Sequence, residues 1–165
     1  MTDQPSAATS AVVCDASALV AALVDGGPAG EWASAQLAGV DLAAPHLAPF
    51  EVANILRRHE LAGLITGDQS SQAHVDLIDL AIELWPYELL AERAWELRAN
   101  LSLYDAAYVA LAERLGGSLV TLDRRIAGAP GLRCDVAHPP ASPTAAITSP
   151  KRARVSGGAK SANQA

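Results

Sequence analysis

The hydrophobic pattern of the chain alternates between short apolar runs and longer amphipathic stretches. Runs such as "AVVC" and "SLVTL" predict strands, and the stretches between them, whose apolar residues recur three or four positions apart, predict helices. The strand-like runs are continuously apolar rather than alternating, which is typical of strands buried on both faces. The pattern therefore predicts an α/β fold with a central parallel sheet covered by helices on both sides.

Residue types at the ends of these stretches predict several element boundaries. A helix after Asp15 is expected to end at the glycines 26–27, and the helix after the second strand is expected to begin at about Phe50. Two pairs have the spacing of a capping box ahead of further helices: Thr66 with Gln69, and Ser102 with Asp105.

Composition divides the chain into three parts. Residues 1–10 are expected to be a flexible N-terminus, and residues 11–138 are expected to form one domain. Residues 139–165 are rich in Ser, Ala, Pro and Gly, which predicts a disordered basic tail. Residues 1–140 hold 8 Lys+Arg against 18 Asp+Glu, a net charge of -10, whereas residues 141–165 hold four basic residues and no acid.

Neither a membrane span nor a secretory signal is apparent in the sequence. No apolar run approaches the roughly 18 to 20 residues that cross a bilayer. The first ten residues lack the Lys or Arg of a signal peptide. We therefore expect a cytoplasmic protein.

Carboxylates recur where the predicted strands end. Asp15 follows "AVVC" and Asp123 follows "SLVTL", while Glu51 and Asp105 lie in the first turns of two helices. Ligands of open parallel sheets bind beyond the carboxyl ends of the strands, so we expect these four acids to converge there. Each acid also has a structural interpretation, as a helix cap or as a first-turn acid favoured by the helix dipole.

Four carboxylates at one sheet edge point to a bound cation. They would repel one another and raise one another's pKa values unless a cation held them together. Oxygen ligands of this kind suit Mg²⁺ or Mn²⁺. The predicted catalytic and metal-binding residues are Asp15, Glu51, Asp105 and Asp123.

Four further polar residues accompany these acids. Ser17 and Thr121 each lie two residues from an acid, where a hydroxyl could bind a carboxylate or a metal-bound water, or alternatively the local backbone. Asn54 and Arg58 share one helix face with Glu51, at i+3 and i+7. That stripe fits a metal–phosphate site, and it equally fits a solvated helix face.

Four motifs in order carry a resemblance to a known family. "VVCDASALVAAL", "APFEVANILRR", "SLYDAAYVALAERLGG" and "LVTLDRRI", over about residues 12 to 137, resemble the PIN domains of VapC toxins from bacterial toxin–antitoxin systems. The resemblance implies a PIN-like α/β/α sandwich around a central parallel β-sheet. It also implies a Mg²⁺- or Mn²⁺-dependent endoribonuclease that hydrolyses RNA phosphodiester bonds, a cognate VapB-like antitoxin and a homodimer.

The resemblance maps the family's acidic site onto Asp15, Glu51, Asp105 and Asp123, and its small polar residue after the first acid onto Ser17. The residues after about 140 extend past the usual end of the family.

Three other function classes compete with this interpretation. A receiver-type domain would need adjacent acids after the first strand and a Lys near the last strand, but the sequence has no Lys before Lys151. A phosphatase with an aspartate nucleophile would typically have a second Asp where Ser17 stands. A PIN-like binding module that acts only through its protein partner, without catalysis, stays open.

Overall fold

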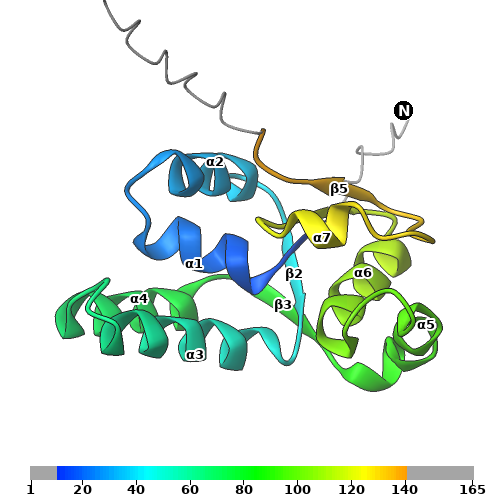
Figure 1. Cartoon of the computed structure of the whole chain (residues 1–165), viewed down its shortest axis with the longest axis horizontal. Helices are drawn as coiled ribbons and strands as arrows, with labels where there is room; N and C mark the ends of the chain where they lie inside the picture. The colour runs from blue at the N-terminus through cyan, green and yellow to red at the C-terminus, as the bar shows by residue number, and fades with distance from the viewer. Residues whose placement is uncertain (1–10, 141–165) are drawn as a thin grey trace, which may run out of the picture.

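A computed structural model describes residues 11–140 as a parallel sheet with helices around it (Figure 1). The predicted N-terminus 1–10 and the predicted tail from residue 141 onward lie outside the described residues. The sheet has five strands in the order β3-β2-β1-β4-β5, and every neighbouring pair is parallel. The strands are β1 (Val12–Cys14), β2 (Leu42–Pro45), β3 (Ile82–Trp85), β4 (Ser118–Val120) and β5 (Asp135–Ala137).

Helices cover both faces of this sheet, which confirms the predicted α/β/α sandwich. One face packs against α1, α3 and α4, and the other packs mainly against α5 and α6. None of the helices in residues 11–140 has the length and apolar character that a membrane crossing requires. The helical elements are α1 (Ala16–Val24), α2 (Pro28–Leu37), α3 (Ala48–Leu61), α4 (Gly67–Asp79), the 3₁₀ turn η1 (Tyr87–Leu89), α5 (Ala91–Leu97), α6 (Leu103–Leu115) and α7 (Arg124–Ala127).

Strand β1 lies at the centre of the sheet and contributes to both cores. Successive side chains of a strand point to opposite faces. Val13 accordingly packs in the core beneath α5 and α6, and Cys14 packs in the core beneath α1, α3 and α4. Both side chains are fully buried, so the position of the next residue, Asp15, is fixed by packing on both faces.

The structure differs from the expected helix boundaries at two places. Helix α2 was not predicted. It follows the glycines 26–27 directly and begins with Pro28. Proline is accommodated there because a backbone N–H in the first turn has no hydrogen-bond partner within the helix. Helix α3 begins at Ala48 rather than at about Phe50, because Pro49 is likewise accommodated in a first turn.

The two predicted capping boxes have different outcomes. Thr66 and Gln69 form both reciprocal bonds at the start of α4. Ser102 caps α6 by accepting a hydrogen bond from the Asp105 amide, but the Asp105 carboxylate accepts its bond from the Ser102 hydroxyl instead of from the backbone. The second prediction is therefore only half confirmed.

The strand order reverses between β1 and β4. The chain first builds β1, β2 and β3 outward in one direction and then places β4 and β5 on the other side of β1. Ligands of open α/β sheets bind at such a switch point, beyond the carboxyl ends of the strands. Cys14 is in register with Val120, so the residues that follow them, Asp15 and Thr121, meet at this point.

Candidate active site

The Asp15 carboxylate is held by two side-chain hydroxyls at the switch point. Its Oδ2 accepts hydrogen bonds from Ser17 Oγ at 2.8 Å and from Thr121 Oγ1 at 2.5 Å. Asp15 is 8% exposed and Thr121 is fully buried. Asp15 is also the N-cap of α1. The same side chain therefore caps the helix and forms part of the site. The sequence placed Ser17 beside Asp15, and its hydroxyl does bind that carboxylate; the sequence placed Thr121 beside Asp123, but its hydroxyl donates to Asp15 instead.

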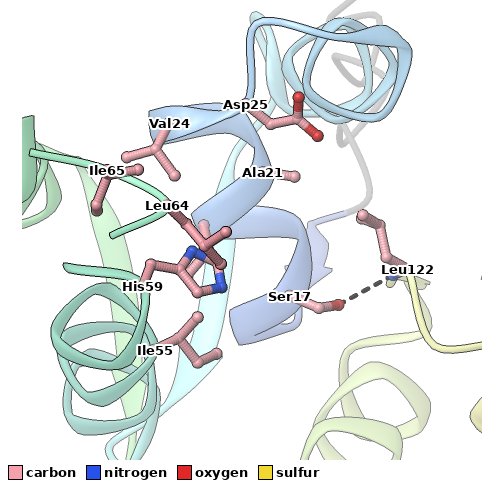
Figure 2. A pocket seen from close by; sticks show the side chains of 10 residues that line it. Ser17, Ala21, Val24, Asp25, Ile55, His59, Leu64, Ile65 and Leu122 are labelled. Carbon is pink, nitrogen blue, oxygen red and sulfur yellow. Dashed lines mark hydrogen bonds between the residues drawn. The ribbon is translucent and has the colours of Figure 1, made fainter. Parts of the chain in front are cut away.

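The same two hydroxyls fix the loop after β4. Ser17 Oγ accepts a hydrogen bond from the Leu122 amide at 3.0 Å, drawn as a dashed line in Figure 2, and Thr121 Oγ1 accepts one from the Asp123 amide at 3.0 Å. The backbone that carries Asp123 is therefore attached to the end of β1, although the two segments are about a hundred residues apart.

Asp123 caps α7 and pairs with Arg125. One carboxylate oxygen accepts a hydrogen bond from the Arg125 amide at 2.8 Å, and the guanidinium forms a salt bridge of 2.5 Å with the other. Chiefly because of these bonds, the pKa of Asp123 is lowered. Asp123 is therefore an ionised carboxylate at neutral pH.

Glu51, on α3, is oriented by a buried tyrosine of α6. The Tyr108 hydroxyl donates a hydrogen bond of 2.6 Å to Glu51 Oε2, and Tyr108 is only 1% exposed. Burial raises the pKa of Glu51; the bond from Tyr108 acts in the opposite direction, and the charges of Asp15 and Asp105 raise the pKa further. Sequence reasoning missed Tyr108. The available signal was that a buried tyrosine hydroxyl usually has a hydrogen-bond partner.

Asp105 lies in the first turn of α6, half-buried, and accepts a hydrogen bond of 2.8 Å from the Ser102 hydroxyl. Burial raises its pKa, the Ser102 bond opposes this, and the charges of Asp15 and Asp123 raise the pKa again. Charge interactions therefore link Asp15 to Glu51 and to Asp105, and Asp105 to Asp123. The structure brings the four predicted acids to one edge of the sheet.

The donor set at this edge suits a hard divalent cation. All four candidate ligands are carboxylates, the type of donor that Mg²⁺ and Mn²⁺ prefer. The negative charges that raise the pKa values of Glu51 and Asp105 are what a bound cation would offset. Within residues 11–140, however, no three His, Cys, Asp or Glu side chains are already grouped as they would be around a metal ion. Each of the four acids instead has a donor from the protein.

An apolar hollow of about 390 Å³ opens beside Ser17. Figure 2 shows it between α1, which contributes Ala21 and Val24, and α3, which contributes Ile55 and His59. The hollow is mostly apolar and contains none of the four acids. It therefore adjoins the acidic edge without being part of it.

A second hollow, of about 310 Å³, is lined by Glu51. Its lining includes Asn54 and Arg58, together with the aromatic residues Phe50 and Tyr104. The predicted stripe of Glu51, Asn54 and Arg58 thus faces a common hollow.

Comparison with known proteins identifies the class to which this fold and site belong. The PIN domain family matches residues 12–132, which lie within the predicted domain. Ribonuclease VapC9 of Mycobacterium tuberculosis is 40% identical over 125 residues, a match that covers 76% of this chain and 95% of the relative. Ribonuclease VapC1 of the same organism is also 40% identical over 125 residues, covering 75% of this chain and 94% of the relative.

Solved structures show the same fold. The VapC20 toxin of Mycobacterium tuberculosis, described as cleaving the sarcin–ricin loop, superposes with a TM-score of 0.56 at 17% identity and covers 70% of this chain and 92% of its own. This chain belongs to the VapC family of PIN-domain proteins. The predicted family is confirmed, and the receiver-type and phosphatase-type alternatives are wrong.

Proposed function

We propose that this chain is the toxin of a toxin–antitoxin system and a Mg²⁺- or Mn²⁺-dependent endoribonuclease that hydrolyses RNA phosphodiester bonds. The ribonuclease names of relatives that are 40% identical support the reaction. The observation that carries the proposal is the convergence of Asp15, Glu51, Asp105 and Asp123 at the switch point of a parallel sheet. A cytoplasmic location remains part of the proposal.

The acids have different proposed roles. Asp15 and Asp105 would bind the ion directly, with help from Asp123 and, through water, from Glu51. A bound divalent ion would lower the pKa of a water molecule and offset the charge that develops on the phosphate.

The other residues of the site position these acids and the substrate. Ser17 and Thr121 hold the Asp15 carboxylate in one orientation, and Tyr108 does the same for Glu51. Arg58, exposed beside Glu51, carries the charge that an RNA phosphate would meet. In a domain of net negative charge, such a local cation is needed because RNA affinity depends on phosphate neutralisation.

The partners belong to the same proposal. A toxin–antitoxin complex of Klebsiella pneumoniae has this fold, at 22% identity and a TM-score of 0.54. By family membership, we propose a cognate VapB-like antitoxin and a homodimer. Light scattering of the purified chain tests the homodimer, and co-purification with a co-expressed VapB-like protein tests the antitoxin.

Cleavage of total RNA by the full chain, with Mg²⁺, Mn²⁺ or EDTA, tests the reaction. We expect cleavage that requires a divalent ion. Asp105→Asn removes one charge at nearly constant volume and should abolish cleavage, whereas Asp41→Asn, a charge-matched change at an exposed position outside the site, should leave it intact. Full activity of Asp105→Asn would reject the proposed site. A wild-type chain that is inert with both ions would favour the non-catalytic binding module.

A further inference from the structure

We propose that the hollow between α3 and the start of α6 binds one unpaired nucleotide of the RNA next to the scissile phosphate. This subsite, called the nucleotide hollow below, is formed by Phe50, Asn54, Arg58 and Tyr104 beside Glu51. The inference rests on the proposed ribonuclease function and specifies the form of RNA that the site accepts.

Two exposed aromatic rings border the nucleotide hollow. Phe50 is 75% exposed and Tyr104 is 63% exposed. Each directly precedes a site acid in the sequence, Glu51 and Asp105 respectively. Unstacked RNA bases are commonly held against aromatic side chains, because every base has a π-face. The rings are therefore placed to receive a base within reach of the acids.

Two polar side chains in the same hollow are free to bind a ligand. Asn54 and Arg58 are exposed, and within residues 11–140 neither side chain has a hydrogen-bond or salt-bridge partner. The guanidinium groups of Arg93 and Arg125, by contrast, are bound to carboxylates. An amide can pair with a base edge and a guanidinium with a phosphate. The hollow thus offers partners for the base and for the phosphate of a nucleotide.

The size of the hollow favours a single nucleotide. Its volume of about 310 Å³ is at the lower end of small-molecule sites, which span roughly 300–1,000 Å³. Bases inside a duplex are stacked and paired, so their faces cannot reach Phe50 or Tyr104. The substrate must therefore present an unpaired nucleotide at this point.

A second copy of the chain is the competing occupant. Phe50 and Tyr104 also border a larger apolar hollow, of about 630 Å³, with Leu47, Tyr87 and Leu103. An apolar interface over the nucleotide hollow would bury the Arg58 guanidinium without a partner, which is costly. A nucleotide supplies that partner, so the observations favour RNA.

Binding of RNA without cleavage tests this subsite. Fluorescence anisotropy of the full chain with a short, unstructured, fluorescein-labelled RNA in EDTA gives the Kd. We expect Phe50→Leu to raise the Kd by about five- to a hundredfold, because one base loses its stacking partner. Trp95→Leu is a matched change at another exposed aromatic residue. It should change the Kd less than about twofold, because no base is proposed to stack on Trp95. Arg58→Ala should weaken binding more than Arg57→Ala, its exposed neighbour on the same helix.

Two outcomes of this assay overturn the inference. One is that the wild-type chain does not bind the RNA, and the other is that Phe50→Leu and Trp95→Leu bind it equally well. If Phe50→Leu converts a dimer to a monomer in light scattering but leaves the Kd unchanged, the rings form an interface between copies. Because EDTA prevents metal-dependent cleavage, the Kd comparison fails or succeeds independently of the Asp105→Asn assay.

Discussion

Thr121→Val removes one hydroxyl at the centre of the site while keeping the volume of the side chain nearly constant. The Thr121 hydroxyl donates to the Asp15 carboxylate at 2.5 Å and accepts from the Asp123 amide at 3.0 Å. Because Thr121 is fully buried, water cannot readily replace either bond. The variant therefore leaves a carboxylate and a backbone amide each short of a partner.

The expected loss of stability follows from these two bonds. A hydrogen bond to a charged group contributes about 1.5–3 kcal/mol and a neutral one about 0.5–1.5 kcal/mol, so the free energy of unfolding should fall by about 2–4 kcal/mol. Thr121→Ser keeps the hydroxyl and loses one buried methyl group, which costs about 1 kcal/mol. The two variants should differ by about 1–3 kcal/mol, and the valine variant should be the less stable.

Urea denaturation measures this difference. With a slope of about 2 kcal/mol per molar urea, the midpoint of Thr121→Val should lie about 0.5–1.5 M below that of Thr121→Ser. RNA cleavage should fall in parallel, since Asp15 loses its main orienting bond, and should persist in Thr121→Ser. A valine variant that unfolds at the same urea concentration as the serine variant, or at a higher one, would refute this account of Asp15.

Two further predictions concern the structure away from the site. Burial opposes ionisation of Glu113, but the bonds that Arg93 donates outweigh burial and lower the pKa of Glu113. The stabilisation from these bonds is therefore present above the ordinary glutamate pKa of about 4.3, and it is lost as the pH falls through the lowered pKa. Arg93→Met should reduce the free energy of unfolding at pH 7 by about 2–3 kcal/mol and flatten its decline in acid, measured by urea titrations from pH 7 to 3. Gly117→Ala would place its Cβ 2.0 Å from the Ala11 carbonyl oxygen, so it should lower the melting temperature more than Gly116→Ala, whose left-handed backbone costs about 1–2 kcal/mol.

Arg57→Met is the matched control for the acid titration, since Arg57 is exposed and makes no salt bridge within the described residues. Equal pH profiles for the Arg57 and Arg93 variants would contradict the assigned role of Arg93. Equal melting temperatures for the two glycine variants would mean that the approach of Ala11 is relieved by a small backbone shift.

The sequence was most informative where strand and acid adjoin. An apolar run followed by a carboxylate predicted strands β1 and β4 with an acid after each, because a parallel sheet brings all carboxyl ends to one edge. Strand β4 ends at Val120, before the predicted end of the run, and the bond from Thr121 to Asp15 was not predicted. The order of the strands was not predictable in this way, since it depends on which buried faces pack together.

Two features escaped the sequence analysis for local reasons. The buried residues of α2 are Gly30, which has no side chain, and Ala33, so the apolar periodicity of this helix is weak. Tyr108 lies within the buried face of α6, among alanine, valine and leucine residues, where it is indistinguishable from an ordinary core aromatic. Only its contact with Glu51, 57 positions away, reveals its part in the site.

The pairing of β1 with β4 also bears on the order in which a ribosome makes this chain. Asp15 emerges early, but Thr121, which orients it, is 106 positions later. At about 5–20 residues per second, the two are separated by roughly 5–20 s of synthesis. A nascent chain that stops before residue 118 has no β4, no Thr121 and no Asp123. Unfinished chains therefore lack the proposed toxic activity, because the site needs Asp123 as well as Asp15.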